Sequence, residues 1–167
     1  MLVVQAVAEL VSLGAQVVDV VLLGSHLDRH LLGHREPEGL DADDLARIVR
    51  EHADRGQAEV ILSPGAFELG ILSLEAARSG RYAGIAALGC VIRGDTSHYD
   101  YVCSECARGV LRAGLETGVP VAFGVLTTDT PEQAFARAGG TAGNKGFEAV
   151  ETALDTAAAL AAVRAGR

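Results

Sequence analysis

A short polar segment after one apolar run carries residues that could bind an anion and move a proton. The run Ile85–Ile92 has no charged residue, and Gly94, Asp95, Thr96 and His98 follow it closely. Backbone N–H groups around Gly94 and the Thr96 hydroxyl could cradle an anion. His98 can exchange a proton near neutral pH. Gly-Asp is also common in turns and a loop histidine is usually solvated, but a position after a buried strand favours a site.

The elements that would position this segment alternate along the chain. Apolar runs of strand length are separated by longer segments with helical spacing, which predicts a parallel α/β sheet with right-handed crossovers. An earlier strand within 15–23, a loop over 24–40 and a helix over 41–55 are expected in the first third. The later strands are expected at 59–62, 85–91 and 121–126, and the later helices at 67–79, 101–117, 131–137 and 146–162.

Three segments with polar or small residues follow the expected later strands. They are 64–68, 93–98 and 127–129. Because the carboxyl ends of parallel strands meet at one edge of a sheet, we expect these segments to line one pocket. Asp100 could orient the His98 imidazole or cap the following helix.

Two aromatic residues and two basic residues are further candidates. Phe67 and Phe123 could form a flat wall for a planar heterocycle, although either could belong to the core. Arg137 could bind phosphate through two N–H groups or stabilise the end of a helix. Lys145 is the only lysine of the chain and lies between glycines, which allow close approach of a ligand or partner. It could also be an ordinary exposed lysine.

The composition predicts one soluble domain over residues 1–167. The chain is 49% hydrophobic and its formal net charge is -8, which argues against nucleic acid as a partner. The first 23 residues resemble neither a signal peptide nor a membrane span, so no membrane partner is expected. Three cysteines without a disulfide framework indicate a reduced, cytoplasmic protein.

Two spacings could suggest a metal site, but simpler interpretations are favoured. Cys103 and Cys106 form a CxxC without a second pair, and two small residues on a helix explain it better than redox or zinc chemistry. His26, His30 and His34 are four residues apart, yet Gly33 and Pro37 weaken the helix that would align them. We expect no metal.

From Pro64 to about Ala161 the chain resembles the 6,7-dimethyl-8-ribityllumazine synthase family. The segments that carry this resemblance are PGAFEL at 64–69, ALGCVIRGDTSHYDYV at 87–102, PVAFGVLT at 120–127, RAGG at 137–140 and GNKG at 143–146. Together they are highly specific. The resemblance implies a three-layer αβα fold with a four-stranded, flavodoxin-like parallel sheet, in which 1–58 form a divergent first strand, loop and helix.

The resemblance implies a transferase of riboflavin biosynthesis. Members condense 5-amino-6-(D-ribitylamino)uracil with 3,4-dihydroxy-2-butanone 4-phosphate, releasing phosphate and water, without a cofactor. His98 would be the general acid/base. The implied substrate-binding residues are Gly94, Asp95, Thr96 and Arg137 for phosphate, Ala66, Phe67 and Glu68 for the ribityl chain, Val91 and Ile92 for the pyrimidine, Phe123 from a neighbouring subunit, and Lys145 at the phosphate end or subunit contact.

The resemblance also implies a homo-oligomer. Family members form pentamers, and some assemble twelve pentamers into an icosahedral capsid. Members lend Arg137 and Phe123 to the site of a neighbouring subunit. The GNKG turn at 143–146 resembles that of the shell-forming members. We expect at least a pentamer.

The first third departs from the family pattern. Members carry an aromatic residue and Asn at the end of the first strand, where the aromatic ring stacks on the pyrimidine, but no aromatic residue precedes Phe67 here. His26 could take that place, and Gly70 stands where Pro is usual. A divergent first third or a shifted reading frame would explain this. The alternatives to an active enzyme are therefore a non-catalytic lumazine- or flavin-binding or shell-forming paralogue and, ranked last, a flavodoxin-like electron-transfer module.

Overall fold

The computed structural model describes residues 18–24 and 58–166 of the chain. Each strand and helix expected after residue 58 is present. The expected helix over 41–55 lies outside the described residues. In chain order the elements are β1 (Val18–Gly24), β2 (Ala58–Leu62), the 3-10 helix η3 (Ala66–Glu68), α3 (Leu69–Arg78), β3 (Tyr82–Ile92), α4 (His98–Thr117), β4 (Val121–Thr128), α5 (Pro131–Arg137), β5 (Ala138–Gly140), β6 (Gly143–Asn144) and α6 (Lys145–Arg164).

The four longest strands form one sheet in the order β2-β1-β3-β4. β3 and β4 are parallel, with Ile85 opposite Val121 and Ile92 opposite Thr128. β1 is antiparallel to both β2 and β3. The expectation of a four-stranded parallel sheet is therefore wrong: the described sheet is mixed, and β3 and β4 are its one parallel pair of neighbours. An apolar run fits either direction, and antiparallel pairing is slightly more stable per residue.

The reversed β1 leaves the other three strands pointing the same way. β2 and β3 each run opposite to β1, and β4 runs with β3, so the carboxyl ends of β2, β3 and β4 share one edge of the sheet. β1 ends at the other edge, where Gly24 pairs with Tyr82 at the start of β3. The three expected loops thus meet at one edge, which we call the carboxyl edge.

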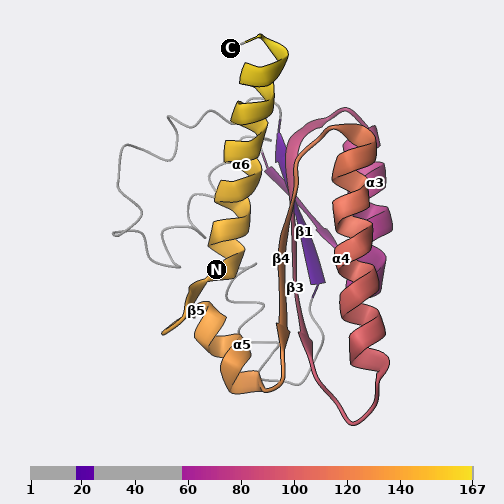
Figure 1. Ribbon diagram of the computed structural model, residues 1–167, viewed down its shortest axis with the longest axis vertical. Helices are drawn as coiled ribbons and strands as arrows, with labels where there is room; N and C mark the ends of the chain where they lie inside the picture. Colours follow the sequence, from indigo (N-terminus) through magenta and orange to yellow (C-terminus); the bar gives the residue numbers. More distant parts are fainter. Residues whose placement is uncertain (1–17, 25–57, 167) are drawn as a thin grey trace.

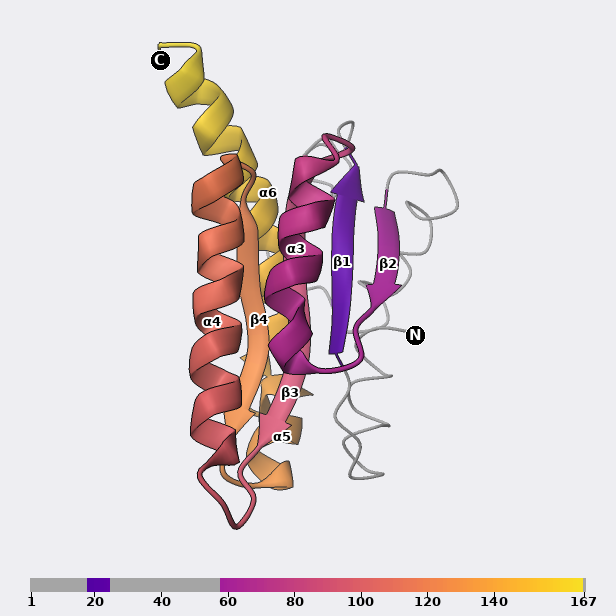
Figure 2. The ribbon, with the colours of Figure 1, turned by 90° about the vertical axis from the view of Figure 1, so that its right-hand side faces the viewer.

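Helices cover both faces of the sheet. α3 and α4 lie on one face, and α5 and α6 lie on the other (Figure 1 and Figure 2). The cores follow the alternation of side chains along the strands. On the α3 and α4 side, Ile85 and Val91 pack with Val102 and Val110, whereas on the α6 side Leu88 packs with residues 149, 150 and 153. The expected three-layer arrangement is present in the described part of the chain.

α3 and α4 approach closely where two glycines meet. A Cβ built on Gly70 would lie 2.8 Å from the Gly109 Cα, and a Cβ on Gly109 would lie 2.9 Å from the Gly70 Cα. The two backbones are therefore in contact, which only glycine permits. Gly70, which the resemblance singled out as unusual, therefore has a packing role in this contact.

Local sequence signals explain where two of the helices begin. The Thr130 hydroxyl accepts a hydrogen bond from the Gln133 N–H at 3.3 Å, and Pro131 takes the first position of α5, as expected. The Asn144 side chain caps α6 by accepting from the Phe147 N–H at 3.1 Å. None of the helices among the described residues has both the length and the apolar character that crossing a membrane requires.

Candidate active site

The junction between β3 and α4 carries the residues expected to do chemistry. Val91 is buried in the core at the end of β3, and residues 93–98 are exposed at the carboxyl edge. α4 begins at His98, about one turn earlier than the expected helix over 101–117. His98 therefore lies in the first turn of a long helix, beside the loop that precedes it.

The loop over 94–97 is open to solvent. Among the described residues other than Gly94 and its two chain neighbours, no atom lies within 4 Å of the position that a Cβ on Gly94 would take. The His98 N–H donates to the Thr96 hydroxyl at 3.4 Å, and Ser97, the residue that precedes α4, makes no side-chain capping hydrogen bond. Free N–H groups at a helix start attract anions. Gly94, Asp95 and Thr96 are thus placed where they could surround a phosphate.

Arg93 holds this junction together. Its Nε donates to Asp129 Oδ1 at 2.9 Å, and its Nη1 donates to Asp100 Oδ1 at 3.0 Å. The guanidinium carbon lies 4.1 Å from the centre of the Tyr99 ring, and the Arg93 N–H donates to the Thr128 carbonyl at 2.9 Å. Hydrogen bonds to the two carboxylates raise the pKa of Arg93. Arg93, at the end of β3, therefore links the end of β4 to the first turn of α4.

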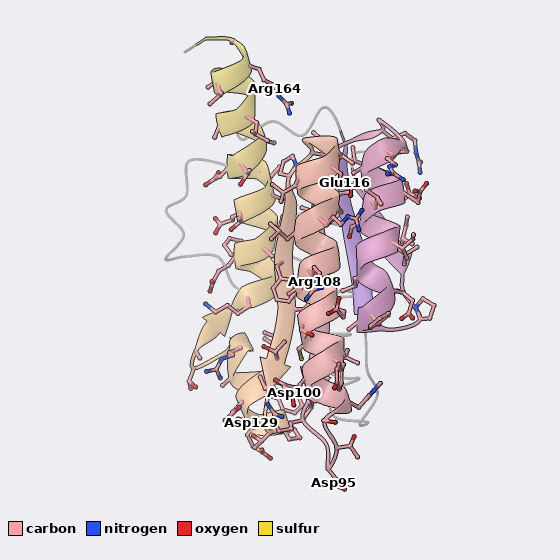
Figure 3. All side chains as sticks on the ribbon, turned by 45° about the vertical axis from the view of Figure 1, so that its right-hand side comes forward. Asp95, Asp100, Arg108, Glu116, Asp129 and Arg164 are labelled. Atoms are coloured by element: carbon pink, nitrogen blue, oxygen red, sulfur yellow. The ribbon has the colours of Figure 1, made fainter. Side chains whose placement is uncertain are left out.

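Sequence reasoning missed Arg93 as a separate element of the site. Asp100 was expected to orient His98 or to cap a helix, but its carboxylate binds Arg93. Figure 3 shows Asp100 and Asp129 close together at the edge where Asp95 extends into solvent. An arginine at a strand end, with acidic residues soon after it and after the next strand, is the signal that could have indicated the pairing.

The segment after β2 comes to the same edge. Ala66 is buried in the same core cluster as Val91, which fixes η3 beside the end of β3. Phe67 next to it is 56% exposed. Glu68 lies in the same short helix, and its N–H donates to the Gly65 carbonyl at 3.3 Å. The protomer therefore brings Ala66, Phe67 and Glu68 to the edge that carries Val91 and His98.

Ile92 links this edge to the other face of the sheet. It packs against the small cluster formed by Cys90, Leu126 and Ala134, of which Ala134 belongs to α5. Val91 and Ile92 therefore face opposite sides of the sheet at its carboxyl edge, as alternation along a strand requires.

Phe123 is on a different part of the sheet. Its side chain is 43% exposed, and it pairs with Ala87 on β3. Ala87 comes four residues before Val91, which is about 13 Å along the strand at the usual rise per residue. The protomer therefore does not bring Phe123 to the loop that carries His98.

Arg137 and Lys145 belong to the other face, with α5 and α6 (Figure 1). The Arg137 Nη1 donates to the Gln133 carbonyl at 3.1 Å, within its own helix. The Lys145 Nζ donates to both carboxylate oxygens of Glu148, at 2.8 and 2.6 Å. Each basic side chain is exposed, and its described partners lie on its own helix.

The cysteines are placed as ordinary packing residues. Cys103 and Cys106 lie on α4, and Cys106 is buried in the core. All three thiols are free, and burial raises the pKa of Cys90 and of Cys106 to about 11. These two thiols are protonated near neutral pH, which disfavours thiolate chemistry. His26, His30 and His34 lie outside the described residues.

A comparison with protein families assigns most of the chain. Residues 40–161 match the family described as 6,7-dimethyl-8-ribityllumazine synthase. The match covers more than half of the chain and begins before Pro64, where the resemblance was expected to start. It includes η3, the β3–α4 junction, α5 and most of α6. The chain therefore belongs to the 6,7-dimethyl-8-ribityllumazine synthase family.

Proposed function

We propose that the chain catalyses the transferase reaction for which its family is named, within riboflavin biosynthesis. The reaction condenses 5-amino-6-(D-ribitylamino)uracil with 3,4-dihydroxy-2-butanone 4-phosphate and gives 6,7-dimethyl-8-ribityllumazine, phosphate and water. It needs a general acid/base, a phosphate-binding site and a surface for the pyrimidine. It needs no metal or organic cofactor.

One observation carries this proposal. His98 and the open loop over 94–97 lie together at the carboxyl edge, inside the region that matches the family. His98 would transfer protons during imine formation, phosphate loss and ring closure. Gly94, Asp95 and Thr96 would hold the phosphate through the loop and the first turn of α4.

The remaining residues complete the substrate site. The exposed Phe67, with Ala66 and Glu68, would contact the ribityl chain. Val91 and Ile92 would meet the pyrimidine at the end of β3. Because Phe123 pairs with Ala87, well before the end of β3, and Arg137 lies on the other face of the sheet, a second copy would supply them. Lys145 would support the phosphate end or the contact between subunits.

A shared site requires an assembly. We propose a pentamer or a shell of sixty subunits, in which the carboxyl edge of one copy meets β4 and α5 of the next. A repeated head-to-tail contact of this kind gives a ring when its rotation closes.

Mixing the purified protein with both substrates and following the absorbance of the lumazine product tests the enzymatic function. We expect product formation well above the uncatalysed rate. Light scattering on the same sample measures the assembly. A rate equal to that of the substrates alone would exclude catalysis, and a fully active monomer would exclude the shared site.

A non-catalytic paralogue is the second candidate, and the direction of β1 favours it. In this family the first strand ends with the aromatic residue that stacks on the pyrimidine. Here β1 ends at Gly24, at the edge opposite to His98. Binding of the lumazine product without turnover, measured by fluorescence, would support this candidate over the enzyme.

A further inference from the structure

The contacts of Arg93 join three separate elements. Its guanidinium binds Asp129 after β4 and Asp100 in α4, and its backbone N–H binds the last residue of β4. The same guanidinium stacks on the Tyr99 ring. A planar group that uses two N–H directions and one face holds these three partners in a fixed geometry, which the compact, rotating ammonium of lysine does not provide.

These contacts fix both ends of the loop over 94–97. Arg93 precedes the loop, and Tyr99 and Asp100 follow it. Within the loop the contacts are local, from the His98 N–H to Thr96 at 3.4 Å and from the Asp100 N–H to the Ser97 carbonyl at 3.0 Å. The position of the loop relative to β4 therefore depends on Arg93.

The positive charge of Arg93 is neutralised by the carboxylates of Asp129 and Asp100. Two carboxylates bind one guanidinium, so the group offers no net positive charge to a phosphate. This separates Arg93 from Arg137, whose described hydrogen bond goes to a neutral backbone carbonyl.

We infer that Arg93 is a positioning residue, which holds the phosphate-binding loop and His98 in place through Asp100 and Asp129 and does not itself bind phosphate. This inference rests on the proposed function for the identity of the reaction. A displacement of about 1 Å in a catalytic group lowers rates by as much as 100-fold. Loss of the Arg93 contacts should therefore reduce turnover without unfolding the protein.

The first experiment compares Arg93→Gln, Arg93→Lys and Asp129→Asn in the assembled protein. We expect each variant to lower kcat/KM by about 10- to 100-fold. Arg93→Lys keeps the charge but loses the two-carboxylate contact and the stacking, so it should not restore activity. The double variant Arg93→Gln/Asp129→Asn should be no worse than Arg93→Gln alone, because Asp129→Asn removes an interaction that Arg93→Gln has already removed. Additive losses would overturn the inference.

Inorganic phosphate distinguishes positioning from direct binding. If Arg93 positions the loop, Asp129→Asn weakens inhibition by phosphate, as Arg93→Gln does. If Arg93 binds phosphate itself, Asp129→Asn releases its charge and strengthens the inhibition. Tighter phosphate binding by Asp129→Asn would therefore overturn the inference.

Arg78→Gln is the matched control. Arg78 also binds two carboxylates, Glu75 at 3.1 Å and Glu116 at 3.4 Å, and it also bridges two elements. Arg78 is the last residue of α3, and its partner Glu116 lies near the end of α4, at the opposite end of that helix from His98. Figure 3 labels Glu116 there. We expect this variant to keep the wild-type kcat/KM. An equal loss of activity in Arg78→Gln would mean that Arg93 acts only through general stability.

Hydrogen–deuterium exchange keeps the test independent of the proposed function. Arg93→Gln should increase exchange in the first two turns of α4, and Arg78→Gln should leave exchange there unchanged. If the wild-type protein forms no lumazine, the proposed function fails, and the exchange data still report whether Arg93 holds the loop. Unchanged exchange in Arg93→Gln would overturn the positioning role.

Discussion

The two sides of the sheet begin their helices in different ways. α4 starts at the carboxyl edge, and Ser97 gives it no side-chain cap. α5 and α6, on the other face, are each capped by a side chain, from Thr130 and Asn144. Because the first N–H groups of a helix need partners, an uncapped start next to an open loop is available to a ligand. The start of α4 therefore has backbone N–H groups suited to binding an anion, whereas α5 and α6 satisfy theirs with their own side-chain caps.

The proposed substrate residues divide along the same line. His98, the loop over 94–97 and residues 66–68 gather at the carboxyl edge. Arg137 and Lys145 lie with the capped helices, and Phe123 is the third residue of β4. One protomer therefore offers two incomplete parts of the proposed site, which two copies could complete.

Replacing His98 should have the largest effect on activity, and it tests the part of the proposed site at the carboxyl edge. We expect His98→Ala to lower kcat by about 100- to 10,000-fold, because it removes the general acid/base. The side chain is exposed, so the free energy of unfolding should change by no more than about 0.5 kcal/mol. Steady-state kinetics and light scattering measure activity and assembly. Ser104→Ala, also exposed on α4, is the control and should keep full activity.

A mixture of two inactive variants tests whether the two regions meet between copies. His98→Ala and Arg137→Ala should each be strongly impaired alone. When they are co-assembled at equal amounts, about a quarter of head-to-tail contacts should join an intact loop to an intact Arg137. Activity of the mixture should then rise well above that of either variant. No recovery in mixed assemblies of confirmed composition would place both residues in one subunit's site.

The sequence predicts the start of α5 better than the start of α4 at the carboxyl edge. The cap and proline of α5 and the apolar strands β3 and β4 are local signals, and the structure confirms each of them. The sequence predicts the start of α4 at Tyr101, whereas the helix begins at His98, and its first turn with His98 and Asp100 carries no apolar spacing. Helix starts at binding edges are hard to predict because their residues are not selected for a cap.

Two other features depend on partners far along the chain. The apolar run of β1 predicts a strand but not its direction, which depends on how β2 and β3 pair with it. Arg93 resembles a solvated charge at a strand end until Asp129, after the next strand, is brought beside it. In both cases the deciding information is tertiary, and the sequence around Arg93 indicates candidate partners without showing that they meet.

The contact between α3 and α4 behind the carboxyl edge gives the next largest effect. Gly109→Ala would place a methyl group 2.9 Å from the Gly70 Cα, so we expect a loss of about 1–3 kcal/mol in the free energy of unfolding. Gly114→Ala on the same helix is the matched control. Its Cβ would meet its nearest atom, the Val119 carbonyl oxygen, at 3.4 Å, and alanine favours a helix. Denaturant unfolding should show destabilisation only for Gly109→Ala, and equal stabilities would exclude a close contact.

Replacing the residues before α4 and α6 should have the smallest effect, and it tests whether the two helices begin differently. Asn144→Ala removes the acceptor of the Phe147 N–H, so we expect a loss of about 1 kcal/mol in the free energy of unfolding. Ser97 precedes α4 as Asn144 precedes α6, but its side chain makes no capping hydrogen bond. The effect of Ser97→Ala on the free energy of unfolding should therefore be close to zero. Thermal unfolding of the two variants beside the wild type measures the difference. If Ser97→Ala lowers the free energy of unfolding as much as Asn144→Ala does, Ser97 caps α4 in solution. The first N–H groups of α4 would then not all be available to an anion.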